Sequence, residues 1–176
     1  SDEALETFRR AEEELSNWSE NDGKELLYFF TGREELFLST MEENPDPARL
    51  DNAEASFRRA LEIDPTYARA QVALGSTYLQ RAQAIPPQTR LQVPSYMEYL
   101  EQALDHHIKG LELALTTEEP LIEAVARIAL ASSYRLLGEA HYLSDSNDEA
   151  VRHFDLAIAE IEQAAPLLAD TRQYRL

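Results

Sequence analysis

Residues 53–65 read AEASFRRALEIDP, which places Ala53, Phe57 and Ala60 on one face of a helix that ends before Pro65. Residues separated by four and three positions share a helical face. A small, large, small stripe lets a neighbouring helix approach closely at each alanine, while the ring fills the space between the two helices. Pro65 ends the helix because the residue before a proline avoids the α-helical region. We interpret the stretch as a helix that packs against a partner helix.

The same stripe occurs four times along the chain. The copies start at positions 4, 53, 103 and 150, so they are 49, 50 and 47 residues apart. Their members are Ala4, Phe8 and Ala11; Ala53, Phe57 and Ala60; Ala103, His107 and Gly110; and Ala150, Phe154 and Ala157. A near-constant period is typical of stacked repeat proteins. The third copy is degenerate, and we expect its histidine to stand in the place of phenylalanine.

A second kind of helix lies between these copies and carries a glycine near its middle. The glycines are Gly32, Gly75 and Gly138. A glycine inside a helix is about 1 kcal/mol less favourable than alanine, so three of them in matching places indicate close packing. Helix breaks are expected at 17–23, 44–47, 85–94, 116–120 and 144–148. Pro120 and Pro166 are expected in the first turns of new helices.

The chain at this point resembles the tetratricopeptide repeat (TPR) family. In that family the first helix of each two-helix unit carries Leu-Gly and an aromatic residue, and the second carries alanine, aromatic, alanine and a final proline. The matching residues are Ala53, Phe57, Ala60, Pro65, Leu74, Gly75 and Tyr78 in one stretch, and Tyr134, Leu137, Gly138, Ala150, Phe154 and Ala157 in another. The resemblance, which also includes the copy at Ala4, covers about half of the chain. It implies an all-α, right-handed solenoid of helical hairpins.

The spacing departs from the family in a way that predicts helix lengths. Gly110 and Leu137 are 27 residues apart, whereas the corresponding Ala60 and Leu74 are 14 apart. The excess corresponds to about two extra turns on each of two antiparallel helices, so we expect a long hairpin over about 97–143. We predict one domain over 1–176, with about seven helices and a partial one at the C-terminus. The incomplete end units favour a segment of a larger protein, or a fold whose ends are covered by something else.

Composition and charge limit the classes of function. Only 5 glycines occur among 176 residues, and helix-favouring Ala, Leu, Glu, Arg and Gln recur, which agrees with an all-α fold. The 33 acidic residues against 16 basic ones give a net charge of −17, which disfavours nucleic acid and anionic membranes. We expect a soluble chain without membrane insertion. The lack of cysteine leaves the compartment open, with the cytoplasm favoured over a bacterial extracytoplasmic location.

The sequence offers no arrangement for catalysis or metal binding. The two adjacent histidines, His106 and His107, point about 100° apart on a helix, and no histidine pair is spaced by four. We expect His141 to be packed in a first-type helix and His153 to lie on the surface. Acidic pairs are abundant but are best explained as solvated faces. With no phosphate loop and no catalytic triad, we predict a protein that is not an enzyme and has no cofactor.

The resemblance implies that first-type helices line a concave groove that binds another protein or a peptide. The positions that match groove-facing ones are Arg69, Val72, Ser76, Leu79, Ser132, Arg135, Glu139 and Tyr142. Family members that grip chaperone C-termini use Lys and Asn where this chain has Val72 and Ser76, so that activity is not expected. The mixed surface suits an extended peptide or a partner helix. The alternative is an ordinary groove surface with no ligand.

Two other interpretations stay open at the level of sequence. Exposed end helices, with apolar residues such as Leu5 and Phe8 uncovered, would stack copies of the chain into a homo-oligomer. Alternatively, Tyr28, Phe29 and Phe30 would form the wall of a small-molecule pocket. For these three aromatic residues, the simpler explanation is a helix buried beneath the long hairpin.

Overall fold

Helices make up all the regular structure in the residues that the computed structural model describes, which are 2–15, 23–41 and 46–173. The seven α-helices are α1 (Asp2–Leu15), α2 (Lys24–Met41), α3 (Pro47–Ile63), α4 (Ala68–Ala84), α5 (Pro94–Thr116), α6 (Pro120–Leu143) and α7 (Asn147–Gln173). A 3-10 helix, Arg90–Gln92, lies between α4 and α5. The predicted all-α fold with about seven helices is therefore confirmed.

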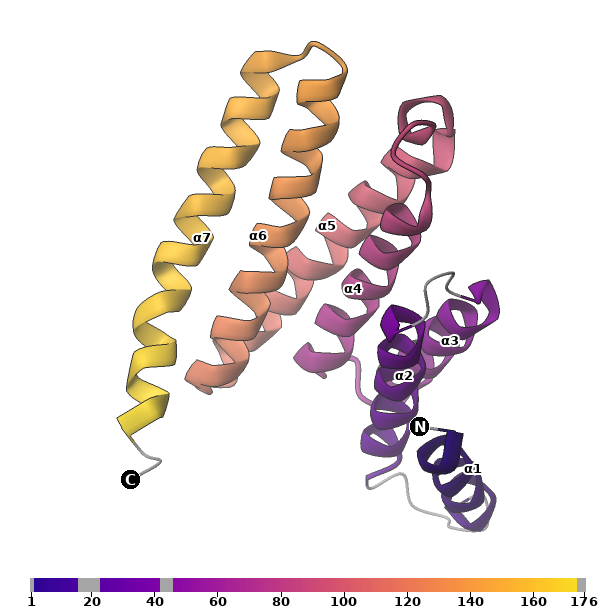
Figure 1. The fold of residues 1–176 in the computed structure, drawn as a ribbon. Helices are drawn as coiled ribbons and strands as arrows, with labels where there is room; N and C mark the ends of the chain where they lie inside the picture. The colour runs from indigo at the N-terminus through magenta and orange to yellow at the C-terminus, as the bar shows by residue number, and fades with distance from the viewer. Residues whose placement is uncertain (1, 16–22, 42–45, 174–176) are drawn as a thin grey trace.

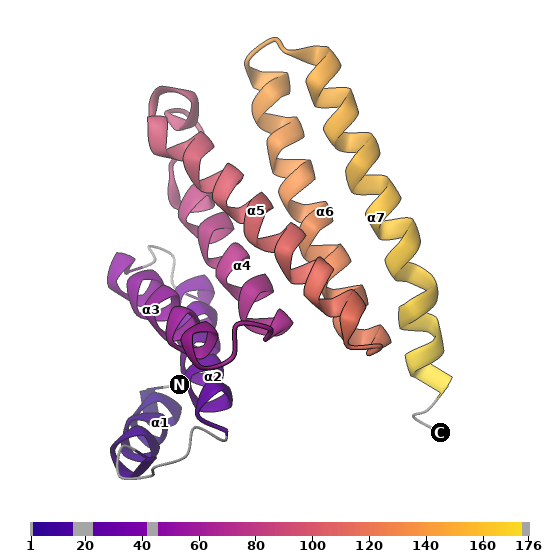
Figure 2. The ribbon, with the colours of Figure 1, turned by 180° about the vertical axis from the view of Figure 1, so that it is seen from behind.

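The helices pair as three hairpins, α2–α3, α4–α5 and α6–α7, which follow one another in chain order (Figure 1). Neighbouring hairpins meet mainly through α3 with α4 and through α5 with α6, and α1 packs on α2. Smaller contacts join α2 to α4 and α4 to α6. In Figure 1, α4 and α6 lie in front of α5, whereas Figure 2 shows α5 in front of them. The first helices of the hairpins thus share one side of the molecule.

Each hairpin has a glycine on its first helix opposite the large residue of the stripe on its second. A Cβ atom added at Gly32 would lie 2.8 Å from Cε1 of Phe57, and one at Gly138 would lie 2.7 Å from Cε1 of Phe154. In the middle hairpin, a Cβ at Gly75 would lie 2.4 Å from Cδ2 of His107. Any side chain at these positions would force the two helices apart. The repeated glycines therefore set the close approach that the sequence predicts.

The two long helices expected over about 97–143 and most of the predicted helix ends agree with the structure, although these two helices belong to neighbouring hairpins. α5 and α6 have 23 and 24 residues, compared with 17 each for α3 and α4. α3 ends at Ile63, just before Pro65, and α6 begins with Pro120. The predicted breaks at 17–23 and 44–47 lie largely outside the described residues.

The prediction for Pro166 is wrong, because this proline lies inside α7 and not at the start of a new helix. α7 continues to Gln173, so the described residues contain no separate partial helix at the C-terminus. A proline inside a helix removes one backbone hydrogen bond. Ala164, two residues before the proline, is buried, and we attribute the continuation of the helix to this packing.

The expectation that Leu5 is uncovered is also wrong. Leu5 is buried, and Phe8, one turn later, is half-buried. α1 rests on α2, and Leu5 borders a polar hollow that includes Arg49 and the buried carboxylate of Glu35. Arg49 donates a hydrogen bond of 3.1 Å to Glu35. The N-terminal helix therefore buries part of its own apolar stripe.

The third copy of the stripe buries its histidine completely. Nε2 of His107 lies 3.1 Å from the carbonyl oxygen of Val72, and Nδ1 lies 2.7 Å from Oγ of Ser133. Because a carbonyl only accepts, Nε2 carries the proton and Nδ1 accepts one from the Ser133 hydroxyl. Burial lowers the pKa of His107 to about 4. A neutral imidazole thus links α4, α5 and α6 where the other hairpins use phenylalanine.

We expect the N-cap of α3 to contribute measurably to stability. The Asp46 carboxylate accepts a hydrogen bond of 3.0 Å from the backbone N–H of Ala48, and Pro47 occupies the first helical position. Replacing Asp46 with alanine should lower the free energy of unfolding by about 1 kcal/mol, because this backbone donor then loses its partner. Urea denaturation followed by circular dichroism measures the change. Asp46→Asn, which keeps a capping oxygen, should stay close to the parent, and an equal loss in both variants would contradict the capping role.

Candidate functional site

A hollow of about 400 Å³ lies between the first helices of the three hairpins, and we call it the central hollow. Its lining residues are Phe29, Phe30, Arg33 and Leu36 of α2, Arg69, Val72, Ala73 and Ser76 of α4, and Leu121, Ile122 and Val125 of α6. The lining is brought together by the contacts of α4 with both α2 and α6. Each helix presents these residues at spacings of three and four, which keeps them on one face.

The central hollow combines an apolar floor with two arginines. The guanidinium carbon of Arg33 lies 4.8 Å from the centre of the Phe30 ring, a cation–π arrangement. Arg69 forms an exposed ion pair of 3.6 Å with Glu119 at the start of α6. No carboxylate is among the lining residues, although the chain carries 33 acidic residues. The lining itself therefore carries two positive charges and no negative one, although Glu119 at its edge offsets the charge of Arg69.

The floor of the central hollow offers few polar groups that are free to hydrogen-bond a ligand. The hydroxyl of Ser76 donates to the carbonyl oxygen of Val72 at 3.0 Å. Val72 itself is buried. Beneath this surface, Phe29 meets the ring of Tyr67 edge to face, with centroids 5.3 Å apart. A ligand would therefore be held by apolar contact, with its charge recognised by the arginines.

The structure separates the predicted groove residues from one another. Arg69, Val72 and Ser76 line the central hollow. Leu79 does not, since it is buried in the core cluster that also contains Tyr96. The expectation that Leu79 faces the groove is therefore wrong, because its side chain joins a core cluster to which both α5 and α6 contribute.

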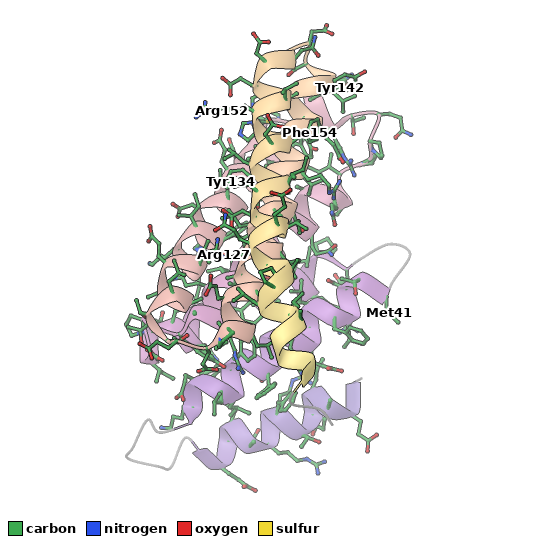
Figure 3. The ribbon with its side chains drawn as sticks, turned by 90° about the vertical axis from the view of Figure 1, so that its left-hand side faces the viewer. Met41, Arg127, Tyr134, Tyr142, Arg152 and Phe154 are labelled. Carbon is green, nitrogen blue, oxygen red and sulfur yellow. The ribbon has the colours of Figure 1, made fainter. Side chains whose placement is uncertain are left out.

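Ser132 and Arg135 line a second hollow, of about 600 Å³, between α6 and α7, which we call the end hollow. Arg135 forms an ion pair with Glu139 one turn along α6, and Tyr142 is exposed beyond it. Figure 3 shows Tyr142 and Phe154 on one side of the α6–α7 hairpin, with Arg127, Tyr134 and Arg152 on the other. The α6 residues of the predicted groove thus belong to a separate surface.

Sequence reasoning missed the contribution of the first turns of α6 to the central hollow. Leu121 and Val125 are exposed, although they are apolar and one turn apart. Ile122, between them, is buried and joins a cluster with Val72. The signal in the sequence was the run PLIEAV, in which apolar residues occupy two faces of the helix at once.

The described residues show neither a metal-binding cluster nor a membrane span. No group of three or more His, Cys, Asp or Glu side chains among them is placed to hold a metal ion. No helix within the same ranges is both long and apolar enough to cross a bilayer. His141 and His153 stack on each other with ring centroids 5.0 Å apart, and both are half-buried.

A scan against protein-family models and a search of curated proteins find no match to this chain. The geometry of the two hollows is therefore the basis for a function.

Proposed function

We propose that this chain is a non-catalytic interaction module, a TPR-like right-handed solenoid, that binds a peptide or a partner helix in the central hollow. The observation that carries the proposal is the lining of that hollow. Three first helices supply apolar side chains, Arg33 and Arg69 supply positive charge, and no lining residue is acidic. An apolar segment with a carboxylate fits this combination, because the ring faces bury its side chains while an arginine pairs with its charge.

The repeat architecture is part of the proposal. It is supported by the recurring pairs of glycine and large residue in Gly32 with Phe57, Gly75 with His107, and Gly138 with Phe154. It is also supported by the order of the contacts, in which each hairpin meets the next. Surfaces built from successive first helices are the usual binding faces of such arrays.

We expect Val125→Asp to weaken peptide binding strongly without unfolding the chain. Val125 is half-exposed on the wall of the central hollow, so an aspartate there is tolerated in the free protein. A bound apolar segment would bury that carboxylate without a partner, and affinity should fall by about tenfold or more. The measurement selects peptides from a phage-displayed library of random dodecamers and compares their affinities for the parent and the variant by fluorescence anisotropy.

Leu91→Asp is the matched control for this experiment. Leu91 is equally exposed but lies in the 3-10 helix, outside the hollow. Its variant should bind the selected peptides as the parent does, and both variants should keep the helical circular dichroism spectrum. Peptides that bind Val125→Asp as tightly as the parent, or a library that gives no binders, would contradict the proposal.

A small apolar anion is the second candidate ligand, because Phe29 and Phe30 do line the central hollow. The probe for it is 8-anilinonaphthalene-1-sulfonate, whose aromatic rings and sulfonate match the floor and the arginines. Saturable binding of this dye that is lost in Val125→Asp, together with a library that gives no peptide, would favour the small molecule. Self-assembly through the N-terminal helix has less support, since Leu5 is buried.

A further inference from the structure

α7 carries a second apolar stripe beside the one that it packs on α6, and we call it the α7 stripe. The two stripes share Phe154, whose ring lies against Gly138 of α6. Its members, spaced alternately by three and four residues, are Val151, Phe154, Ile158, Ile161 and Ala165. This spacing is the one with which two helices pack along a shared seam. Ile158 and Ile161 are 55% and 47% exposed. A helix in the described structure thus leaves an association surface open to solvent.

The α7 stripe forms one wall of the end hollow. Phe154, Ile158 and Ile161 line it from α7, and Ala131 and Ser132 line it from α6. Because the α6 residues on the facing side are small, a shallow groove is left between the two antiparallel helices. The end hollow has a volume of about 600 Å³, which leaves room for side chains of another helix.

The preceding hairpin shows what such a surface binds. In α5, Leu111 and Ala114 stand one repeat before Ile158 and Ile161, and they are only 9% and 1% exposed. They are buried in a cluster to which α6 contributes Ile122, Ala126 and Leu130. The positions that are buried beneath α6 in α5 are therefore exposed to solvent at the equivalent places in α7. The occupant that fits is a helix with aliphatic and small residues four positions apart.

The charges beside the α7 stripe select the kind of helix. Asp155 and Glu162 lie seven residues apart on the same edge of the stripe, at positions that flank a helix seam. Neither carboxylate forms an ion pair with a residue that the structure describes. Arg135, the basic residue on the α6 side of the end hollow, is already paired with Glu139. A second copy of this chain would bring a net charge of −17 towards another of −17, which opposes association. A helix with basic residues along its flank has complementary charge.

We propose that the end hollow binds an amphipathic helix of another protein, one that carries an aliphatic and small stripe with a basic flank. This site is separate from the central hollow, because the two share no lining residue. The bound helix would cover the α7 stripe as α6 covers α5. Its basic side chains would pair with Asp155 and Glu162.

The test uses two designed helical peptides of five turns and the full chain. Both peptides carry the stripe isoleucine, alanine, leucine at spacings of four, and their flanks carry either three lysines or three glutamates. Fluorescence anisotropy should show binding of the lysine peptide about tenfold tighter than the glutamate peptide, the effect of two exposed ion pairs in one complex and like-charge repulsion in the other. The difference should shrink as salt is added. Ile158→Asp should abolish binding of the lysine peptide.

Matched variants keep the result interpretable. Leu156→Asp changes an exposed leucine on the same helix, outside the stripe, and should bind as the parent does. Reversing the flank with Asp155→Lys and Glu162→Lys together should reverse the preference between the two peptides. Val125→Asp, in the central hollow, should leave this binding intact, so failure here is distinguishable from failure of the proposed function.

Three outcomes would overturn the proposal. Equal affinity for both peptides would mean that charge does not select the partner, and no binding at millimolar peptide would mean that the surface does not bind helices. A molar mass by light scattering that doubles with concentration, and falls to that of one chain in Ile158→Asp, would mean that a second copy is the occupant.

Discussion

Replacing Phe57 with alanine is expected to lower the free energy of unfolding by about 3–5 kcal/mol, the range for removing a buried aromatic ring. The Phe57 ring is completely buried, and its atoms press against the backbone of α2 at Gly32. Because glycine has no side chain, nothing on that part of α2 can move into the cavity. Urea denaturation followed by circular dichroism measures the loss. Phe154→Ala, at the equivalent but half-buried position, should give a smaller one.

The contact between Phe57 and Gly32 makes a second result testable. Gly32→Ala alone should destabilise the chain, since its Cβ would lie 2.8 Å from the ring. In the Phe57→Ala background the clash is gone, and alanine should stabilise α2 by up to about 1 kcal/mol over glycine. The sign of the Gly32 substitution should therefore reverse between the two backgrounds. Additive effects would show that the ring and the glycine do not determine how closely α2 and α3 approach.

Stability should fall as the pH is lowered from about 6.5 towards 4, because of His107. Its pKa is about 4 in the folded chain, below the ordinary value of about 6.5 in the unfolded one. Within this window the unfolded chain binds a proton that the folded chain does not, so folding is disfavoured as pH drops. The full difference corresponds to about 3 kcal/mol. Above neutral pH both states are neutral at this residue, and the effect is absent.

The double variant His107→Phe with Ser133→Ala isolates this effect. Phenylalanine occupies the equivalent places opposite Gly32 and Gly138, and the alanine removes a hydroxyl that would lose its partner. The carbonyl of Val72 still accepts a hydrogen bond from Ser76. Burial also lowers the pKa of His106, which remains in both proteins and cancels in the comparison. Unfolding free energies that fall in parallel for parent and variant between pH 6.5 and 4 would contradict the role of His107.

The pairing of helices was predictable because it depends on residue patterns within one helix and the next along the sequence. A glycine in one helix and a large residue in the next, such as Gly138 and Phe154, mark the point of closest approach. The excess between Gly110 and Leu137 likewise predicted the lengths of α5 and α6, since residue number converts directly to helical turns.

The errors arise where local preference competes with tertiary packing. Pro166 is a good first residue of a helix in isolation, but α7 continues through it, and Ala164 just before it is buried. For Leu5 and Leu79, the apolar periodicity of the sequence correctly indicates an apolar helical face. Which faces become covered depends on where a distant helix crosses them, and periodicity does not contain that information.

The candidate site was predictable only in part for the same reason. Arg69, Val72 and Ser76 face the central hollow because α4 lies between α2 and α6. Ser132 and Arg135 were placed on the same surface by analogy between repeats. α6 instead contributes its first turns to the central hollow and its middle to the end hollow.

The order of contacts between the helices also bears on how the chain reaches its native state. All extensive helix contacts join elements that are adjacent or next but one along the sequence. Loops that must close before two helices meet are therefore short, and closing them requires little chain entropy. Topologies of this kind fold fast because native contacts form between segments that are never far apart. Each hairpin can therefore pack on the one before it without first forming contacts with the other end of the chain.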